Sequence, residues 1–264
     1  MTLEIRDVKY RYCETYVLDG VSLEICPGEI IGILGMNGSG KTTLLKNLNR
    51  NISPESGSVL IDGQDLAGIT KKDIARSIAS VPQINEIRFS FTVEDIVSMG
   101  RMPFQRQFGG ESSEDMEIIE NAMRDVGIYD MKDRYVSEMS GGERQKVIIA
   151  RALAQTPMYL LMDEPTNHLD INAQFEVLDL VSGLARKKGI SVVLVSHDLS
   201  MASRYCDRIA LIKERKIVAV GTPEEVLTPE NMRNVFLVDA ELIKNPKTGS
   251  RMVQLNGSVR SRVI

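Results

Sequence analysis

Residues 35–42 are Gly35-Met36-Asn37-Gly38-Ser39-Gly40-Lys41-Thr42, which matches the pattern G-x-x-x-x-G-K-[ST]. A nearly continuous apolar run at residues 29–34 precedes them and predicts a strand buried on both faces. The residues that follow, 41–48, are expected to form a helix. Glycines between a strand and a helix let the backbone wrap a phosphate closely, and the helix N-terminus supplies positive potential there. The stretch therefore predicts a phosphate-binding loop within an α/β fold.

The predicted loop carries two side chains suited to ATP and its metal ion. Lys41 is expected to reach the β and γ phosphates, and the Thr42 hydroxyl is expected to coordinate Mg²⁺. The full set of expected nucleotide contacts in this stretch is Gly35, Asn37, Gly38, Ser39, Gly40, Lys41, Thr42 and Thr43. A chance glycine-rich turn would lack the flanking strand and helix, so the context favours ATP binding.

Two carboxylates follow a second apolar run, at residues 158–162. They are Asp163 and Glu164, and they fall at the carboxyl end of the predicted strand, where open α/β sheets bind their ligands. Asp163 is expected to hold Mg²⁺ through water, and Glu164 is expected to polarise the attacking water as a general base. The alternative interpretation is a solvated acidic turn.

Strand and helix patterns alternate along the rest of the chain. Residues 190–195 predict another buried strand, residues 173–184 carry apolar side chains at helical spacing, and residues 3–12 alternate apolar and polar side chains. Strands alternating with helices predict crossover connections and a largely parallel sheet. Together with the phosphate loop, they predict an α/β P-loop NTPase core.

The stretch between residues 83 and 150 differs because buried-strand runs are absent from its sequence. Helices are expected at 93–99, 115–126 and 142–153, with Ser112 as the N-cap of the second. We read the stretch as a helical subdomain inserted into the core. The expected organisation is one domain over 1–256, with its core at 1–83 and 150–256, its helical subdomain at about 84–149, and a disordered tail at 257–264.

The composition limits the classes of partner and location. Among 264 residues, 32 Lys and Arg against 36 Asp and Glu give a net charge of −4, so no global basic field favours nucleic acid. The three cysteines, Cys13, Cys26 and Cys206, have no metal or redox spacing and are expected to be buried apolar side chains in a reducing compartment. Neither a secretory signal nor a transmembrane run is found, so we expect a cytosolic protein or one held at a membrane by its partners.

Residues 139–143, Met-Ser-Gly-Gly-Glu, lie just before a predicted helix and resemble a known motif. They are similar to the signature L-S-G-G-Q of the ATPase subunits of ABC transporters, with Met139 in place of leucine and Glu143 in place of glutamine. The other motifs of that family occur in order: Val81-Pro82-Gln83 resembles the Q-loop, Asn167-His168-Leu169-Asp170 the D-loop, and Ser196-His197-Asp198 the switch loop.

The resemblance implies a role for each of these residues. Ser140, Gly141 and Gly142 would grip the γ phosphate of an ATP held by the phosphate loop of a second, antiparallel copy. His197 would touch the γ phosphate and hold the attacking water, and Gln83 would join the Mg²⁺ site to the helical subdomain. Tyr12 resembles the aromatic residue that stacks on adenine, with Tyr10 as the competing candidate, and the alternative is that either ring is simply part of the core.

Two further stretches narrow the resemblance. Residues 91–103 and 221–229 are similar to the ATPases of importers for ferric siderophores, haem and cobalamin. That subfamily pairs an ATPase homodimer with two transmembrane permease subunits and an external substrate-binding protein. The resemblance thus implies an ATPase at the cytoplasmic face of the membrane, held there peripherally. It also implies a permease-docking groove along residues 84–104, where Arg101 and Phe104 are expected to be exposed.

The sequence is compatible with two alternatives. A soluble ABC ATPase of translation or DNA repair typically has two cores or a long coiled-coil insertion and a basic face, which this sequence lacks. An exporter or amino-acid importer ATPase of the same superfamily would differ only in the transported substrate. Copurification with a permease would distinguish a transporter ATPase from the first alternative. The identity of the transported ligand would distinguish a metal-chelate importer from the second.

Overall fold

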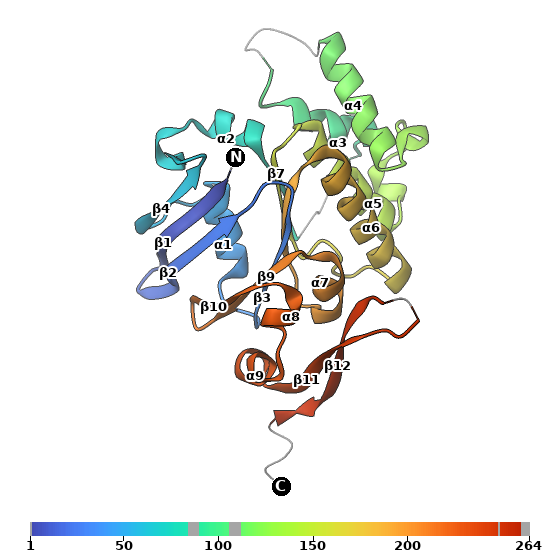
Figure 1. Ribbon diagram of the computed structural model, residues 1–264. Coiled ribbons are helices and arrows are strands. Elements are labelled where there is room, and N and C mark those ends of the chain that lie inside the picture. Colours follow the sequence, from blue (N-terminus) through green and yellow to red (C-terminus); the bar gives the residue numbers. More distant parts are fainter. Residues whose placement is uncertain (1, 84–89, 106–111, 248, 260–264) are drawn as a thin grey trace. The chain divides into compact units, whose positions relative to one another are not determined.

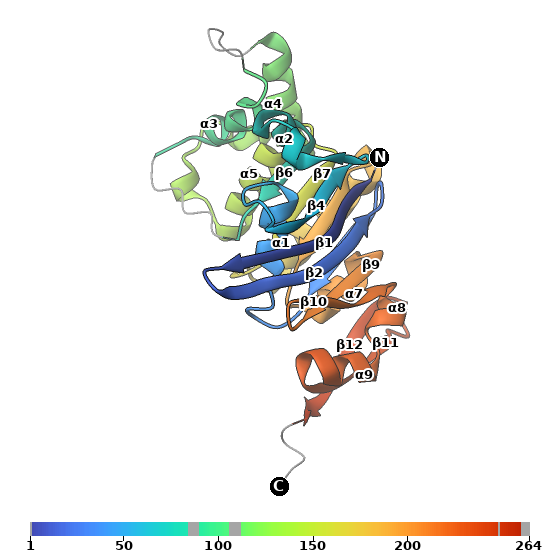
Figure 2. The same cartoon turned by 90° about the vertical axis from the view of Figure 1, so that its left-hand side faces the viewer.

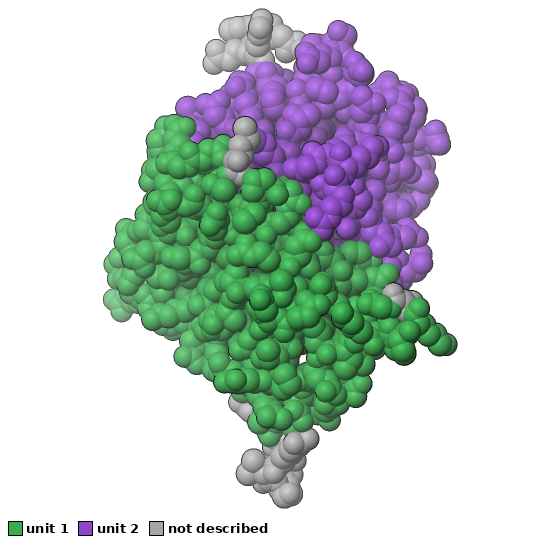
Figure 3. Space-filling model, in the orientation of Figure 1, with its two compact units in different colours: residues 1–68, 191–264 green, residues 69–190 purple. Residues whose placement is uncertain are grey.

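The computed structural model describes residues 2–83, 90–105, 112–247 and 249–259. The chain divides into two compact units, coloured separately in Figure 3. Unit 1 comprises residues 1–68 and 191–264, and unit 2 comprises residues 69–190. In the described part of the chain, no helix has both the length and the apolar character needed to span a membrane.

Unit 1 contains two layers of strands. An antiparallel sheet has the order β2-β1-β4-β5, formed by Thr15–Ile25, Leu3–Tyr12, Ser56–Ile61 and Gln64–Asp65, and Figure 2 shows β1 and β2 side by side. The second group has the order β10-β9-β3-β8, formed by Lys216–Gly221, Arg208–Lys213, Ile30–Leu34 and Ser191–Val195. Strand β3 is parallel to both β8 and β9. All residues of β3 and β8 are buried, as their nearly continuous apolar runs predict.

Short helices and a hairpin complete unit 1 (Figure 1). Helix α1, Lys41–Leu48, follows β3 after the glycine-rich loop, and α7, Leu199–Tyr205, follows β8. The elements after β10 are α8 (Pro223–Val226), α9 (Pro229–Asn231), a π-helical turn (Met232–Phe236), β11 (Val238–Lys244) and β12 (Arg251–Ser258). Because β12 includes Gly257 and Ser258, the expected tail is ordered at its first two residues, and residues 260–264 lie outside the described residues.

Unit 2 is mainly helical but also contains two parallel strands, β6 (Ile78–Val81) and β7 (Tyr159–Asp163). Its helices are α2 (Lys71–Ser77), α3 (Val93–Ser98), α4 (Ser113–Asp125), α5 (Gly141–Ala154) and α6 (Ile171–Lys188). The helices expected at 93–99, 115–126, 142–153 and 173–184 therefore form to within a few residues. Local sequence specifies their starts, because capping boxes join Thr92 to Asp95, Ser112 to Asp115 and Ser140 to Glu143.

The boundaries of the units differ from the expected subdomain boundaries. Residues 69–83 and 150–190 group with the helical stretch instead of with residues 1–68. The strands are the reason, since β6 pairs with β7 and α5 packs on β6.

The cysteine prediction is correct for one residue and wrong for another. Cys206 is buried, and desolvation raises the pKa of its thiol. Cys26 is half-buried. Cys13 is exposed because it occupies the tight turn between β1 and β2, where it adopts the left-handed backbone conformation with a φ of 54°. A thiol at a hairpin turn has no core to enter, which the residue count could not reveal.

Candidate functional site

The phosphate loop of unit 1 joins β3 to α1 through close backbone contacts. A Cβ atom on Gly35 would lie 2.4 Å from the carbonyl oxygen of Ile212 and 2.8 Å from Ser39 Oγ. Gly40 has a φ of 105°, and a Cβ there would lie 2.6 Å from the carbonyl oxygen of Val17. Only glycine fits both positions without displacing main-chain atoms.

Lys41 lies within this loop with its charge enclosed. The residue is only 6% exposed, and its Nζ atom donates hydrogen bonds to the carbonyl oxygens of Gly35 at 2.8 Å and Met36 at 3.1 Å. These bonds hold the ammonium group at the centre of the loop. The same group is the cation that the sequence predicts at the β and γ phosphates.

The start of α1 is rich in donors. Its N-cap is Gly40, and no side chain in the described part of the chain caps this helix start. Ser39 Oγ is buried without a hydrogen-bond partner among the described residues, while Thr42 is exposed at the first turn and Thr43 is buried. Uncapped N–H groups, an unpaired hydroxyl and an enclosed ammonium are suited to an anion with several acceptor oxygens. The site therefore fits the phosphates of ATP.

The residues fit Mg²⁺ only in combination with that nucleotide. Among the residues that the structure describes, no group of three or more His, Cys, Asp or Glu side chains could hold a metal ion. Mg²⁺ characteristically binds one or two protein oxygens together with phosphates and water, so the exposed Thr42 hydroxyl meets that need. The chemistry of the donor set thus agrees with a nucleotide-bound ion.

The two candidate tyrosines for the adenine base differ in exposure. Tyr12 is 47% exposed at the end of β1, whereas Tyr10 is half-buried. Their rings meet edge to face, with 5.0 Å between the centroids and 79° between the planes. Tyr10 supports the ring of Tyr12 from the side, which leaves Tyr12 the better placed to stack on a base.

His197 follows β8 at the same edge of the sheet as the phosphate loop. Strand β8 is parallel to β3, with Val195 opposite Ile33, and Ser196 N–H donates to the Ile33 carbonyl at 3.3 Å. The carboxyl ends of both strands therefore coincide. His197 itself is exposed, and the next residue, Asp198, caps α7 by accepting a bond from Met201 N–H at 2.9 Å.

Unit 2 brings together the ends of β6 and β7. Because these strands are parallel, Gln83 and Glu164 lie at the same edge, and Gln83 Nε2 donates to Glu164 Oε2 at 3.0 Å. Asp163 ends β7 and is 8% exposed. Glu164 has a φ of 48°, a left-handed conformation that is strained for this residue type and is often found at functional positions.

Asn167 is a member of this cluster that the sequence did not identify. Its Nδ2 atom donates to Glu164 Oε2 at 3.0 Å, and its backbone N–H donates to the Glu164 carbonyl at 3.1 Å. The only indication in the sequence is its position three residues after Glu164 in the D-loop motif. Gln83 and Asn167 together fix the orientation of the Glu164 carboxylate.

The signature residues lie at the start of α5, also in unit 2. Ser140 is the N-cap and is exposed, and Gly141 and Gly142 form the first turn. A Cβ on Gly142 would lie 3.2 Å from Ala173 Cβ, so this turn packs closely against α6. The predicted site residues therefore form two groups, one at the phosphate loop of unit 1 and one at the ends of β6, β7 and α5 in unit 2.

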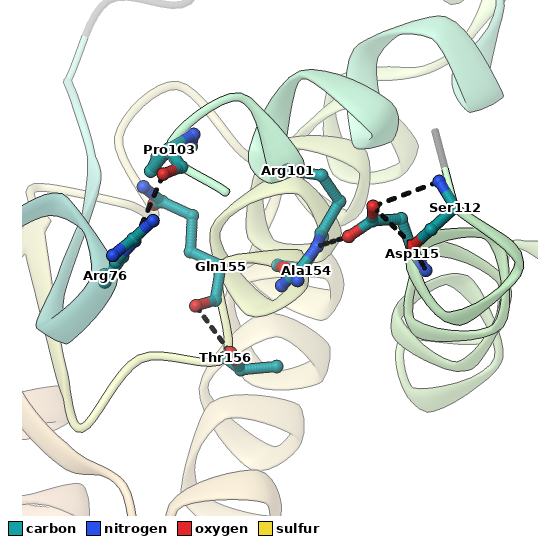
Figure 4. A network of polar contacts seen from close by, with 8 residues as sticks. All are labelled: Arg76, Arg101, Pro103, Ser112, Asp115, Ala154, Gln155 and Thr156. Atoms are coloured by element: carbon teal, nitrogen blue, oxygen red, sulfur yellow. Dashed lines mark hydrogen bonds and ion pairs between the residues drawn. The ribbon is translucent and has the colours of Figure 1, made fainter. Parts of the chain in front are cut away.

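The expected exposure of Arg101 is wrong. Arg101 is 5% exposed; its Nε donates to Asp115 Oδ1 at 2.8 Å, and its NH1 donates to the Ala154 carbonyl at 2.8 Å (Figure 4). Its guanidinium lies 3.8 Å from the ring centroid of Phe104. A buried guanidinium requires such partners, and the bonds from Arg101 and Ser112 lower the pKa of Asp115. Arg101 is thus a structural link between α4 and the end of α5.

Near Arg101, side chains other than Arg101 form the protein surface. Phe104 is half-buried and Met102 is 63% exposed. A cavity of about 420 Å³ in unit 2 is lined by Phe91, Glu94, Asp95, Ser98, Met99, Met102, Gln105 and Met116. The first part of the expected docking stretch, residues 84–89, lies outside the described residues.

Comparison with known proteins identifies the family. The family model for ABC transporters matches residues 18–167, which is more than half of the chain. Several curated relatives are more than 30% identical over nearly the whole chain. The protein therefore belongs to the ABC transporter family.

Three relatives have named transport systems. The chain is 39% identical over 95% of its length to a cobalamin import ATP-binding protein of Halobacterium salinarum, and it spans 62% of that protein's length. It is 39% identical to a probable siderophore transport system ATP-binding protein of Bacillus subtilis, over 94% of this chain and 90% of the relative. It is 35% identical to a hemin import ATP-binding protein of Bordetella pertussis, over 97% and 99%.

Two solved structures resemble the fold. A chain from a metal-chelate type ABC transporter in an inward-facing conformation gives a TM-score of 0.84 at 26% identity, covering 96% of this chain and 97% of that one. A dimeric bacterial ABC transporter cassette gives a TM-score of 0.72 at 28% identity, covering 84% and 98%. The predicted fold class, an ABC-type P-loop ATPase, is thereby confirmed.

Proposed function

We propose that this chain is the ATP-hydrolysing subunit of an ABC importer, working as a homodimer that closes on ATP and drives uptake through a membrane permease. The observation that carries the ATPase assignment is the phosphate loop, where Lys41 is enclosed beside an uncapped helix start. The names of the relatives support a metal chelate as the substrate, such as a ferric siderophore, haem or cobalamin.

Each predicted residue has a place in this reaction. Tyr12 stacks on adenine, and the loop from Gly35 to Thr43 binds the phosphates. Thr42, Gln83 and Asp163 would hold Mg²⁺, which neutralises part of the phosphate charge when bound. Glu164, oriented by two amide side chains, accepts the proton of the attacking water, and His197 donates a hydrogen bond that keeps the γ phosphate and this water in line.

Dimer closure explains how binding becomes mechanical work. Ser140, Gly141 and Gly142 of one copy would meet the γ phosphate bound by the other, so the two copies align only when ATP is present. A ligand shifts an equilibrium by its differential affinity for the two states, and ATP binds the closed state better. The similarity to a dimeric cassette supports this arrangement.

The permease and an external substrate-binding protein are the further partners of this proposal. The cavity beside Met102 offers apolar side chains with two carboxylates, Glu94 and Asp95, to a segment of the permease. Such a contact would hold the ATPase at the cytoplasmic face of the membrane.

Affinity purification of the tagged protein from its host membranes, in mild detergent, tests this proposal. Recovery of a many-helix permease together with ATPase activity is the expected result. Recovery of ribosomes or DNA would instead indicate a soluble ABC ATPase, and a permease for amino acids or for export would correct the substrate class.

A further inference from the structure

The signature serine is held by a carboxylate of its own helix. Ser140 N–H donates to Glu143 Oε2 at 2.8 Å, and Ser140 Oγ lies 2.8 Å from the same oxygen. Because an ionised carboxylate only accepts hydrogen bonds, the Ser140 hydroxyl is the donor. Glu143 N–H donates in return to Ser140 Oγ at 3.3 Å. The single proton of this hydroxyl is therefore engaged by Glu143.

This arrangement opposes the binding of phosphate at the start of α5. A phosphate oxygen needs the same proton that Ser140 now gives to Glu143. The carboxylate also offsets the partial positive charge at the helix N-terminus and places a negative charge where another would have to approach. Contact between Ser140 and phosphate thus requires the hydrogen bond from the Ser140 hydroxyl to Glu143 to break, and repulsion between the carboxylate and the phosphate favours displacement of the Glu143 side chain.

A cation is available to receive the displaced carboxylate. Arg134 NH1 lies 3.9 Å from Glu143 Oε1. The bonds from Ser140 Oγ and N–H both go to the other carboxylate oxygen, Oε2. Both side chains are partly exposed, 46% for Arg134 and 29% for Glu143, so neither is locked by packing. The Ser140 bonds and then Arg134 lower the pKa of Glu143, which keeps this carboxylate charged at neutral pH.

We propose that Glu143 gates the signature serine: it holds the Ser140 hydroxyl in the separate copy, and its shift toward Arg134 frees Ser140 for the γ phosphate bound by a second copy. The inference rests on the proposed function, because it needs a dimer driven by ATP. Glu143 and Arg134 are then positioning residues that set the ATP concentration at which two copies close. Glutamine, which the motif L-S-G-G-Q has at this position, would keep the reach of the side chain without its charge.

The experiment measures dimer formation against ATP concentration, with Mg²⁺ present, in a Glu164→Gln parent that retains its nucleotide. Adding Glu143→Gln should lower the ATP concentration for half-maximal dimer on the order of tenfold, since a unit charge next to phosphate is removed. Adding Arg134→Gln should raise it, because the carboxylate loses its alternative partner. Glu120→Gln, which removes a partly exposed carboxylate from α4, is the matched control and should leave the concentration unchanged.

Ionic strength separates this role from a merely structural one. Salt screens partly exposed charges, so the difference between the parent and the Glu143→Gln variant should shrink as salt is raised, while equal melting temperatures would show that the cap is intact. An unchanged half-maximal ATP concentration in Glu143→Gln, or an equal shift in Glu120→Gln, overturns the gate. A parent that forms no dimer with ATP overturns the proposed function itself and the gate with it.

Discussion

Helices α1 and α5 both begin at glycine-rich loops, yet their first turns are prepared differently for phosphate. Helix α1 starts after Gly40, without a side-chain cap in the described structure, and its first turn carries the cation Lys41. Helix α5 starts after Ser140, which forms a capping box with the acidic Glu143. The first turn of α1 presents uncapped N–H donors and a positive charge. At the start of α5, the Glu143 carboxylate accepts the hydrogen bonds of Ser140.

This difference suggests an order of events. An uncapped start with an enclosed ammonium is preorganised, so a single copy can bind ATP without rearrangement. A capped start is stable alone and must exchange partners before it meets phosphate. In the proposed mechanism, ATP binding by one copy therefore precedes closure of two.

The largest expected effect is a loss of ATP affinity on substitution of Lys41, in the first turn of α1. Lys41→Ala should abolish ATP binding, because removing one partner of a buried charge pair costs roughly 3–5 kcal/mol. Binding of a fluorescent ATP analogue measures the loss. Lys46→Ala, at an exposed position in the last turn of the same helix, should bind like the parent. Retained affinity in Lys41→Ala would refute the assignment of the phosphate loop.

The next largest effect is on the rate of ATP hydrolysis, once ATP is bound at the starts of both α1 and α5. Glu164→Gln should slow ATP hydrolysis by roughly 10²- to 10⁴-fold, the usual contribution of a general base, while ATP binding is retained. Phosphate release under saturating ATP measures the rate. The Gln83 and Asn167 amides can still donate to the carbonyl oxygen of the new amide, so the fold of the turn should persist. Hydrolysis at the parental rate would exclude Glu164 as the base.

A substitution at the start of α5 can prevent dimer closure while ATP binding at the start of α1 is retained. Ser140→Arg in the Glu164→Gln parent should leave ATP bound by each copy but prevent the closed dimer, because a bulky cation would fill the position where phosphate arrives. Gel filtration with ATP reports the dimer directly. Ser113→Arg, which places the same side chain at the exposed first position of α4, is the control. A stable dimer of Ser140→Arg would contradict the contact between two copies.

The sequence was informative where neighbours along the chain determine the structure. The strand and helix that flank residues 35–40, the buried runs of β3 and β8, and the N-cap at Ser112 all depend on residues within a few positions, and all formed as predicted. One contact between distant residues was missed: Arg101 was expected at the surface, but it is buried because it donates to the Ala154 carbonyl, 53 positions away along the chain. Gln83 and Glu164, 81 positions apart, were placed at one site only through the family resemblance. Pairing of this kind depends on tertiary packing, which periodicity and motif spacing do not encode.

The smallest effects compare the two serines that flank the helix starts. Ser140→Ala removes the α5 cap and should lower the free energy of unfolding by about 1 kcal/mol, with ATP binding by the single copy unchanged. Ser39→Ala removes a buried hydroxyl that has no partner among the described residues, so it should leave stability unchanged or slightly raised, because an unsatisfied buried group is destabilising. That variant should weaken ATP binding instead, since the hydroxyl is available to a phosphate oxygen. Urea unfolding and nucleotide titration of both variants measure the two quantities side by side. A loss of stability in Ser39→Ala together with a loss of ATP binding in Ser140→Ala would contradict the comparison. It would show that Ser39 stabilises the fold and that Ser140 binds ATP in the single copy.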